Sequence, residues 1–330
     1  MIPLFRYRNT CLVDTAYALS VYLLYTDDAI GDRTMFICGP GVPKVLVDKL
    51  PHKIYLEGAH VASPKECKAF RRKSLFTWLF RRFTNLYAQD HVWLFNAIIG
   101  TQSYTYIEDC PEVYTKCHDF AMQEPIERND FRWRFWAFRN FGTTYRHPLG
   151  YNSQCVNRII TSPRDEDSKY LKGRKYTLLD YKKAYQTATP QKQEFIRNVF
   201  SISDDILHQL SSSEVIIFTQ PFTTDCGLTE EEQVRLYAPY IEKYIDQGLI
   251  IKPHPRDNVD YCKYYPQVHV INTKAPMQLL EAFDMNIKIA ITVCSTAVSC
   301  LVGKAEIIWI GSEVDPRLIE RFGHQKNPYV

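Results

Sequence analysis

The sequence predicts a protein of two α/β domains, each built on a doubly wound parallel sheet covered by helices. Three observations support this fold class. The chain has 330 residues, enough for two domains that each bury a core. Short apolar segments of strand length alternate with helical patterns in two separate sets. A polar, tyrosine-rich stretch lies between the sets, and we place the domains at residues 1–205 and 206–330.

The first set of strands starts near the beginning of the chain. An apolar segment from Cys11 to Val13 precedes Asp14 and Thr15, which can cap a following helix. We expect further strands at residues 33–39, 53–58, 91–98 and 103–109, and a helix from about residue 65 to residue 87. Residues 111–213 hold no long apolar run, so we interpret them as an insertion, outer helices and a linker, with helices at 176–188, 191–200 and 204–210.

The second set of strands is expected at residues 213–220, 248–254, 267–273, 287–295 and 305–311. Between the first two strands, residues 229–248 have a helical pattern that Thr229 can cap and Gly248 can close. In doubly wound sheets, ligands bind at the carboxyl ends of the strands. In a two-domain protein we therefore expect them in the cleft between the domains.

Composition and charge exclude several classes of partner. The formal net charge of +3 gives no general case for binding nucleic acid. The ten cysteines occur singly, with no C-x-x-C pair and no secretory signal, which predicts reduced thiols in a cytoplasmic protein. No apolar run reaches the roughly 18 residues that a membrane span needs. Any contact with a membrane is therefore expected at its surface.

Polar side chains follow three strands of the second half, where each strand ends. Ser295 and Thr296 open a predicted helix, whose free N–H groups favour a phosphate. An imidazole and two cations on a neighbouring strand would add to such a site. Alternatively, the Ser–Thr pair is only a helix cap. The candidate residues are Gln220, Thr223, Thr224, Asp225, Lys252, His254, Arg256, Ser295 and Thr296.

His254 lies between Pro253 and Pro255 at the end of an apolar run. Each proline fixes its own φ and biases the preceding residue toward extended geometry. We therefore expect the imidazole to leave the strand end in one direction, toward a phosphate.

The first half carries one acidic pair in a comparable place. Glu108 and Asp109 end an alternating strand and are followed by Cys110 and Pro111. A carboxylate there can act as the general base that deprotonates a sugar hydroxyl. The alternative interpretation is a solvated turn or a helix cap.

Other motifs carry less weight. Asp165 and Asp167 form a D-x-D of the kind that binds a metal and a nucleotide diphosphate, but no strand precedes them, so a solvated loop is expected. His147 and Pro148 are likewise expected in a loop. The dinucleotide, P-loop and zincin motifs are absent from the sequence.

The segment from Phe70 to Tyr87 combines arginines with aromatic residues in an amphipathic pattern. Such a helix suits the surface of an anionic membrane. A helix that packs its aromatic side into the core explains the same residues. We keep both interpretations.

The segments TQPFTTD and KPHPRD, the later Ser–Thr pair and the acidic pair together resemble the bacterial sialyltransferases of glycosyltransferase family 52, which modify lipooligosaccharide. The resemblance is strongest over residues 214–312. More distantly, the chain is similar to other bacterial sialyltransferases with acidic, HP and Ser-Ser/Thr motifs. The resemblance implies a GT-B fold and an inverting, metal-independent transfer of sialic acid. The donor would be CMP-sialic acid, the acceptor a galactose hydroxyl of a lipooligosaccharide or capsular glycan, and no cofactor is implied.

The resemblance also implies roles for individual residues. His254 would contact the donor phosphate, which Ser295 and Thr296 would also bind. The base would be Asp109 or, by analogy with family 52 itself, Asp225. Glu108 falls on the acceptor side, and Cys110 stands where the related motifs have glycine. The remaining expected donor-binding residues are Gln220, Lys252, Pro255 and Arg256.

Two alternatives stay open. The same scaffold could use another sugar nucleotide, such as UDP-glucose or UDP-galactose, or the protein could be a non-catalytic glycan-binding relative. The expected partners are a nucleotide-sugar donor, a glycan acceptor and a second copy of the chain in a homodimer. The expected location is the cytoplasm, with peripheral contact to the inner membrane of a bacterium through residues 70–87.

Overall fold

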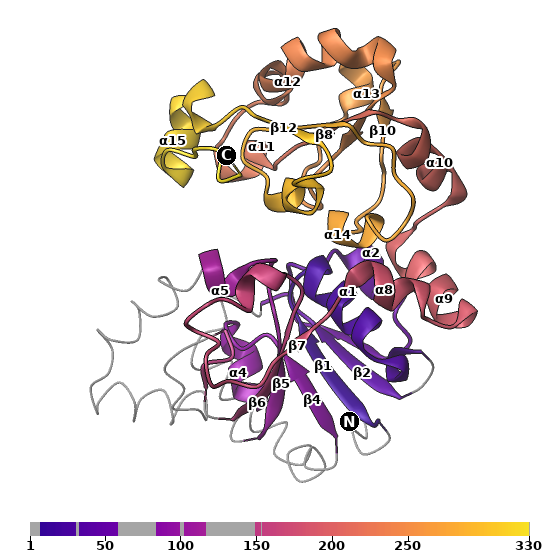
Figure 1. The fold of residues 1–330 in the computed structure, drawn as a ribbon, viewed down its shortest axis with the longest axis vertical. Helices are drawn as coiled ribbons and strands as arrows, with labels where there is room; N and C mark the ends of the chain where they lie inside the picture. Colours follow the sequence, from indigo (N-terminus) through magenta and orange to yellow (C-terminus); the bar gives the residue numbers. More distant parts are fainter. Residues whose placement is uncertain are drawn as a thin grey trace. The chain divides into compact units, whose positions relative to one another are not determined.

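The computed structural model describes residues 7–30, 33–58, 84–99, 102–116, 149–152 and 154–329. The chain divides into two compact units, Met1–Val199 and Phe200–Val330 (Figure 1). Each unit is built on a single sheet in which all strand pairs are parallel. The predicted fold class, with two parallel Rossmann-like sheets, is therefore confirmed.

The sheet of the first unit has the strand order β3-β2-β1-β4-β5-β6-β7. The order reverses direction between β1 and β4, which makes the carboxyl ends of these strands a topological switch point. The strands are β1 (Asn9–Val13), β2 (Thr34–Cys38), β3 (Lys53–Tyr55), β4 (Asn85–Ala88), β5 (Tyr104–Ile107), β6 (Cys155–Ile160) and β7 (Thr177–Leu178).

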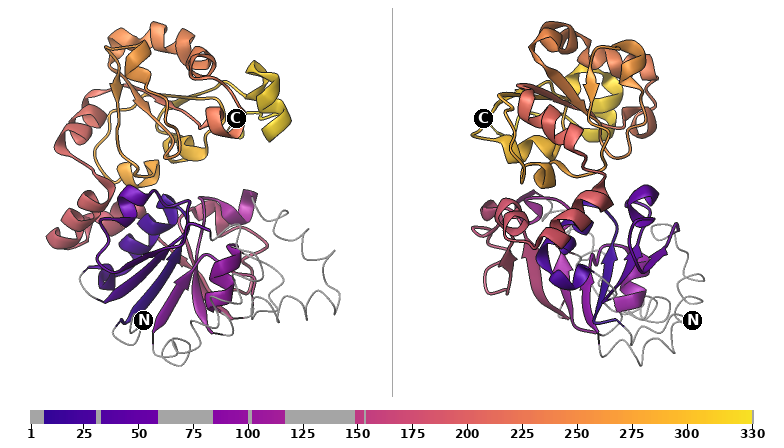
Figure 2. Two further views of the ribbon diagram at one scale, coloured as in Figure 1. Left: turned by 180° about the vertical axis from the view of Figure 1, so that it is seen from behind. Right: turned by 90° about the vertical axis from the view of Figure 1, so that its right-hand side faces the viewer.

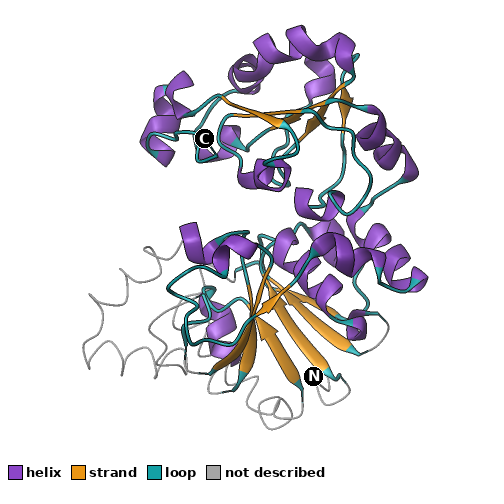
Figure 3. Cartoon of the chain, in the orientation of Figure 1, coloured by secondary structure: helices purple, strands orange, loops and turns teal. Residues whose placement is uncertain are grey.

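Helices lie against this sheet (Figure 3). β1 and β2 are buried along their whole length, as expected for strands of a covered parallel sheet. Thr15 caps the helix after β1 by accepting a hydrogen bond from the Ala18 N–H at 3.1 Å. The helices are α1 (Ala16–Tyr25), η2 (Asp27–Ala29), α2 (Lys44–Val47), α4 (Trp93–Ile99), α5 (Val113–Lys116), η3 (Pro163–Asp165), α8 (Tyr181–Gln186) and α9 (Pro190–Phe200).

Four predictions of helices and strands in the first unit are wrong. Residues 177–178, assigned to the start of a helix, form strand β7. Residues 91–98, predicted as a strand, contain most of helix α4, because a short apolar run fits either structure. Residues 85–87, assigned to the end of a helix, lie in strand β4. Strand β6 was missed because its polar Asn157 and Arg158 are buried within it. The remainder of the predicted helix, residues 65–83, lies outside the described residues.

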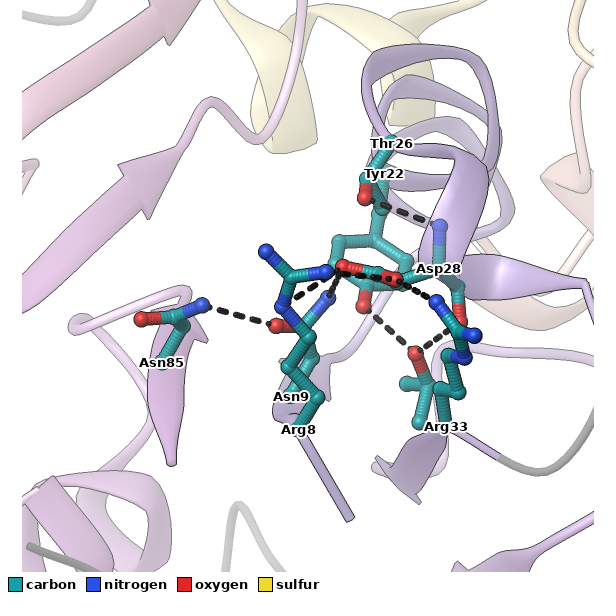
Figure 4. Close-up of polar contacts among 8 residues, drawn as sticks. Arg8, Asn9, Tyr22, Thr26, Asp28, Arg33 and Asn85 are labelled. Carbon is teal, nitrogen blue, oxygen red and sulfur yellow. Dashed lines mark hydrogen bonds and ion pairs between the residues drawn. The ribbon is translucent and has the colours of Figure 1, made fainter. Parts of the chain in front are cut away.

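Polar side chains connect the amino-terminal ends of β1 and β4 (Figure 4). Asp28 accepts hydrogen bonds from Arg8, Asn9 and Arg33, each at 3.4 Å. Asn85, at the start of β4, donates to Asn9 at the start of β1 at 3.1 Å. These groups bind one another, so we interpret the cluster as structural.

The sheet of the second unit, which Figure 2 shows from two further sides, has the strand order β10-β9-β8-β11-β12. All five strands lie within the predicted segments, and here the order reverses between β8 and β11. They are β8 (Val215–Phe218), β9 (Leu249–Lys252), β10 (His269–Val270), β11 (Ile289–Thr292) and β12 (Glu306–Trp309).

The longest described helix of this unit, α12 (Glu230–Tyr244), has the predicted ends. Thr229 and Glu232 form a capping box, in which each side chain accepts from the other residue's backbone N–H. Gly248 closes the following turn, η4 (Ile245–Gln247), with a left-handed φ of 68°. The other helices are α10 (Asp204–Ser212), α11 (Phe222–Asp225), α13 (Tyr261–Tyr264), α14 (Met277–Leu280), η5 (Thr296–Leu301), η6 (Ser312–Val314) and α15 (Pro316–Phe322).

The buried face of α12 packs on one side of the second sheet. Val234 and Ile241 belong to the same buried cluster as Ile217 of β8 and Ile251 of β9. This packing fixes α12 against the strands whose carboxyl ends carry the candidate residues. None of the helices that the structure describes is long and apolar enough to cross a membrane.

Candidate functional site

The segment after β9 forms a tight turn that holds His254. The Asp257 N–H donates to the His254 carbonyl at 2.8 Å and closes the turn. The Arg256 N–H donates to His254 Nδ1 at 3.1 Å, so Nδ1 is an acceptor and Nε2 carries the proton of the neutral ring. We call residues 253–257 the HP turn.

The surroundings of His254 disfavour its charged form. Burial, followed by the neighbouring charges of Arg256 and Lys252, lowers its pKa from 6.5 to about 4. At neutral pH the imidazole is therefore uncharged. It can donate a hydrogen bond through Nε2–H, but it supplies no positive charge of its own.

Asp225 and Arg256 form an ion pair between α11 and the HP turn. Both guanidinium NH2 groups donate to the carboxylate, each at 2.9 Å, in a two-pronged geometry. The structure thus brings together two candidate residues that are 31 positions apart in the sequence. Both oxygens of Asp225 accept hydrogen bonds in this arrangement.

Lys252 has turned inward from the end of β9. Its buried ammonium group donates to the Thr273 carbonyl at 3.0 Å and to the Pro253 carbonyl at 3.2 Å. Burial, and secondarily the charge of Lys274, lowers its pKa to about 7. Burial also lowers the pKa of Lys274, a residue that follows β10 and that no sequence pattern singled out. Lys252 therefore anchors the strand end as well as adding partial positive charge.

The Ser–Thr pair follows β11, the strand next to β8 at the switch point of the second sheet. Ser295 is buried and its Oγ accepts from the Ala297 N–H at 3.3 Å, so it is the cap of η5. Thr296 is exposed. η5 is a 3-10 helix of only six residues. Gln220, which follows β8, is partly buried. Ser295 is therefore a helix cap, as the alternative interpretation of the pair expected. Of the two hydroxyl groups in the pair, that of Thr296 is the one exposed to solvent.

A pocket of about 480 Å³ lies in the second unit beside the HP turn. Pro253 and Asp257 line it from the turn, and Thr273 and Lys274 line it from the segment after β10. Gln209 of α10 also lines it. Its amide oxygen is buried without a hydrogen-bond partner among the described residues. The pocket is within the size range of small-ligand sites.

The acidic pair of the first unit separates into two different environments. Glu108 is fully buried and accepts a hydrogen bond from the Tyr17 hydroxyl at 2.5 Å. Burial, opposed by hydrogen bonds from Thr161 and Tyr17, raises its pKa to about 8. Glu108 is therefore mostly protonated at neutral pH. The interpretation of the pair as a solvated turn is wrong for Glu108.

Asp109 is accessible and is oriented by its neighbours. Its side chain is 36% exposed, and its Oδ1 accepts from Gln89 Nε2 at 2.8 Å. His91 Nε2 lies 3.9 Å from the same oxygen. Gln89 in turn accepts a hydrogen bond from the Asp14 N–H and so connects β4 to β1 at the switch point. Gln89 and His91 were missed because residues 85–87 were assigned to a helix and residues 91–98 to a strand, so neither side chain was expected just after the end of a strand.

Cys110 stands where the related acidic motifs have glycine. Its backbone is not left-handed, and its partly buried side chain packs against the core of the first unit. The left-handed residue in this loop is Glu112, with φ 61°. The turn therefore does not need glycine at position 110.

The D-x-D segment is a structural feature. Asp165 is buried, and its Oδ1 accepts from the N–H and the hydroxyl of Thr115 at 2.9 and 2.8 Å. It thus ties η3 to α5, which contradicts the expected solvated loop. His147 and Pro148 lie outside the described residues, as does the segment 70–83.

Two Rossmann-like units with polar residues at their strand ends define a protein of the GT-B class. Residues 82–308 match the sequence family described as Glycosyltransferase family 52, and the chain belongs to that family. The matched range contains all the candidate catalytic and donor-binding residues.

The chain is also similar to an uncharacterized protein of Haemophilus influenzae, with 27% identity over 241 residues, 73% of this chain and 72% of that protein. Among solved structures it resembles UDP-GlcNAc 2-epimerase of Methanocaldococcus jannaschii, with a TM-score of 0.47, 12% identity, and coverage of 97% and 95% of the two chains. It also resembles the spinosyn forosaminyltransferase SpnP, with a TM-score of 0.47, 10% identity, and coverage of 90% and 79%.

Proposed function

We propose that this glycosyltransferase moves sialic acid from CMP-sialic acid to a terminal galactose hydroxyl of a lipooligosaccharide or capsular glycan, with inversion and without a metal. The observation that carries the proposal is the HP turn. It fixes one neutral imidazole, with its Nε2–H available, beside Arg256 and Lys252. A donor with a single phosphate needs this kind of local hydrogen-bonding and cationic site.

The leaving group sets the chemistry of the second unit. When the bond between the sialyl anomeric carbon and the phosphate oxygen breaks, the sugar becomes oxocarbenium-like and the phosphate of CMP gains negative charge. His254 donates to that phosphate through Nε2–H, while Arg256 and the exposed Thr296 hydroxyl contact its other oxygens. Donors aimed at developing charge are among the strongest catalytic contributions of a site.

The acceptor needs a base, for which Asp109 and Asp225 are the two candidates. Both oxygens of Asp225 already accept hydrogen bonds from Arg256, and its side chain is only 18% exposed. Asp109 is oriented by Gln89 through one oxygen and is accessible. We therefore favour Asp109 as the base and assign Asp225 to the orientation of Arg256. Glu108, protonated and buried, supports the strand end from which Asp109 projects.

The nucleoside of the donor is proposed to occupy the pocket beside the HP turn. Lys274 would lie at the phosphate end of the nucleoside, and the unpaired amide oxygen of Gln209 would accept from a donor group on it. Gln220 and Pro255 complete the proposed donor site. We also propose that the protein acts in the cytoplasm and contacts anionic membranes peripherally through residues 70–87. Co-sedimentation with anionic lipid vesicles tests the membrane contact.

A comparison of nucleotides tests this assignment. We expect CMP to raise the melting temperature of the protein, and UDP at the same concentration to leave it nearly unchanged. At one hundred times its Kd, a ligand that binds only the folded state stabilises it by about 2.7 kcal/mol. Stabilisation by UDP but not by CMP would favour a UDP-sugar transferase. If CMP-sialic acid binds but no CMP is released with any galactose-terminated acceptor, the protein is a non-catalytic glycan-binding relative.

A further inference from the structure

Gln233 on α12 connects two separate parts of the candidate donor site. Its side chain is fully buried. Its Nε2 donates to Asp257 Oδ2 at 3.0 Å and to the Tyr261 hydroxyl at 2.8 Å. Its Oε1 accepts from the Thr223 N–H at 3.0 Å. Both ends of one amide are therefore engaged, each with a different segment.

The first segment is the HP turn. Asp257 closes this turn through its backbone N–H, and its buried carboxylate accepts from Gln233, Tyr261 and the Thr219 hydroxyl. The Val259 N–H donates to its other oxygen at 3.1 Å. A buried carboxylate with this many donors is held in one orientation. Gln233 thus fixes Asp257, and Asp257 fixes the turn that carries His254.

The second segment is α11. This helix has only four residues and no side-chain cap, so the N–H of Thr223 in its first turn has no partner within the helix. The Gln233 amide oxygen provides that partner. Asp225 lies two residues further along α11 and pairs with Arg256 of the HP turn.

We propose that Gln233 is a positioning residue, which sets the direction of the His254 imidazole and the Asp225–Arg256 pair by attaching both segments to α12. The inference rests on the proposed function, in which these groups handle the donor phosphate. A methionine of similar length would fill the same space without hydrogen bonds. The contribution specific to the amide is therefore the connection between the two segments.

The test compares Gln233→Met with two other variants. Tyr261→Phe removes a hydroxyl bound to Asp257 and leaves the link from Gln233 to Thr223 in place. Val234→Ala removes apolar packing from the adjacent, buried position of α12 without touching the network, so it is the control for loss of stability. If Gln233→Met does not fold, Gln233→Asn keeps the amide but is too short to reach both segments.

The first readout is the ¹⁵N NMR spectrum of the His254 ring in the free protein. We expect the wild type and Val234→Ala to show the single tautomer protonated at Nε2, because Nδ1 accepts from the Arg256 N–H. Gln233→Met should show a mixture of tautomers, and Tyr261→Phe an intermediate change.

The second readout is the rate of sialyl transfer. Misplacement of reacting groups can cost on the order of a hundredfold in rate. We expect a loss of that order in Gln233→Met and a smaller one in Tyr261→Phe. A His254 spectrum and a transfer rate in Gln233→Met equal to those of Val234→Ala would overturn the positioning role. If even the wild type transfers no sialic acid, the proposed function fails, while the NMR comparison still decides the role of Gln233.

Discussion

His254 illustrates how the chain makes a hydrogen-bond donor from a group that is usually considered a charge. Its two flanking prolines hold the backbone, and the Arg256 N–H occupies Nδ1. Burial and nearby cations keep the ring neutral at pH 7. In the proposed function, positive charge near the donor phosphate then comes from Arg256 and the lysines. This division of roles differs from a site in which an imidazolium itself binds the anion.

The neutral state of His254 predicts a specific pH dependence of donor binding. A fluorinated CMP-sialic acid analogue carries a phosphodiester that does not titrate near neutrality. Its affinity should be nearly constant between about pH 5 and 6, because His254, with a pKa of about 4, and Lys252, with a pKa of about 7, both keep their charge there, and it should weaken as the pH rises through 7 and Lys252 loses its charge. If the charged imidazolium were the binding form, affinity would fall by about tenfold per pH unit above its pKa.

Replacement of His254 by alanine provides the companion result. Loss of one strong electrostatic donor lowers turnover by on the order of a hundredfold. His254→Ala should therefore lose about that factor in turnover while retaining its fold. Isothermal titration of the analogue, together with turnover measurements on both proteins, checks these two expectations.

At the scale of secondary-structure elements, the candidate residues gather at the carboxyl ends of strands. In the second sheet, β8 lies between β9 and β11. Asp225 follows β8, the HP turn with Arg256 follows β9, and the Ser–Thr pair follows β11. In the first sheet, the acidic pair follows β5, and Gln89 and His91 follow β4. The Rossmann topology accounts for both placements, because parallel strands end at one edge.

The two candidate bases are separable by substitution. Asp109→Asn should lower the transfer rate by at least a hundredfold with little change in the Kd for CMP, since the base acts on the acceptor. Asp225→Asn should instead weaken CMP binding, because it releases Arg256 from its pair. The opposite result would make Asp225 the base. In that case Asp225→Asn would lose all transfer with unchanged affinity for CMP, and Asp109→Asn would remain active.

The strands that could be predicted from the sequence have one property in common, an apolar run with a clear polar boundary. The five strands of the second unit are apolar runs bounded by polar turns, and all of them were identified. The residues of the HP turn were identified because two prolines follow such a run. β4 was not, because its residues were assigned to the end of a helix, and β6 was not, because it buries Asn157 and Arg158, whose identity suggests exposure. Gln233 was missed because it is a single polar residue on a helical face whose burial depends on tertiary packing.

At the scale of the whole molecule, the chain is a member of glycosyltransferase family 52 with two Rossmann-like units. The second unit holds a neutral imidazole, a paired arginine and a pocket of about 480 Å³, to which we have assigned the donor. The first unit holds an accessible, oriented carboxylate at the end of a strand. These are the two requirements of glycosyl transfer, a stabilised leaving group and a base for the acceptor.

The central claim is that CMP-sialic acid is the donor and that its sugar is transferred with inversion. The most direct measurement is a ¹H NMR time course of the protein with CMP-sialic acid and galactose-terminated acceptors, including lactose and a lipooligosaccharide oligosaccharide. We predict release of CMP in step with a sialylated product, whose anomeric configuration is opposite to that of the donor. Transfer from UDP-glucose or UDP-galactose with no reaction of CMP-sialic acid, or a product that retains the donor's configuration, would contradict the account.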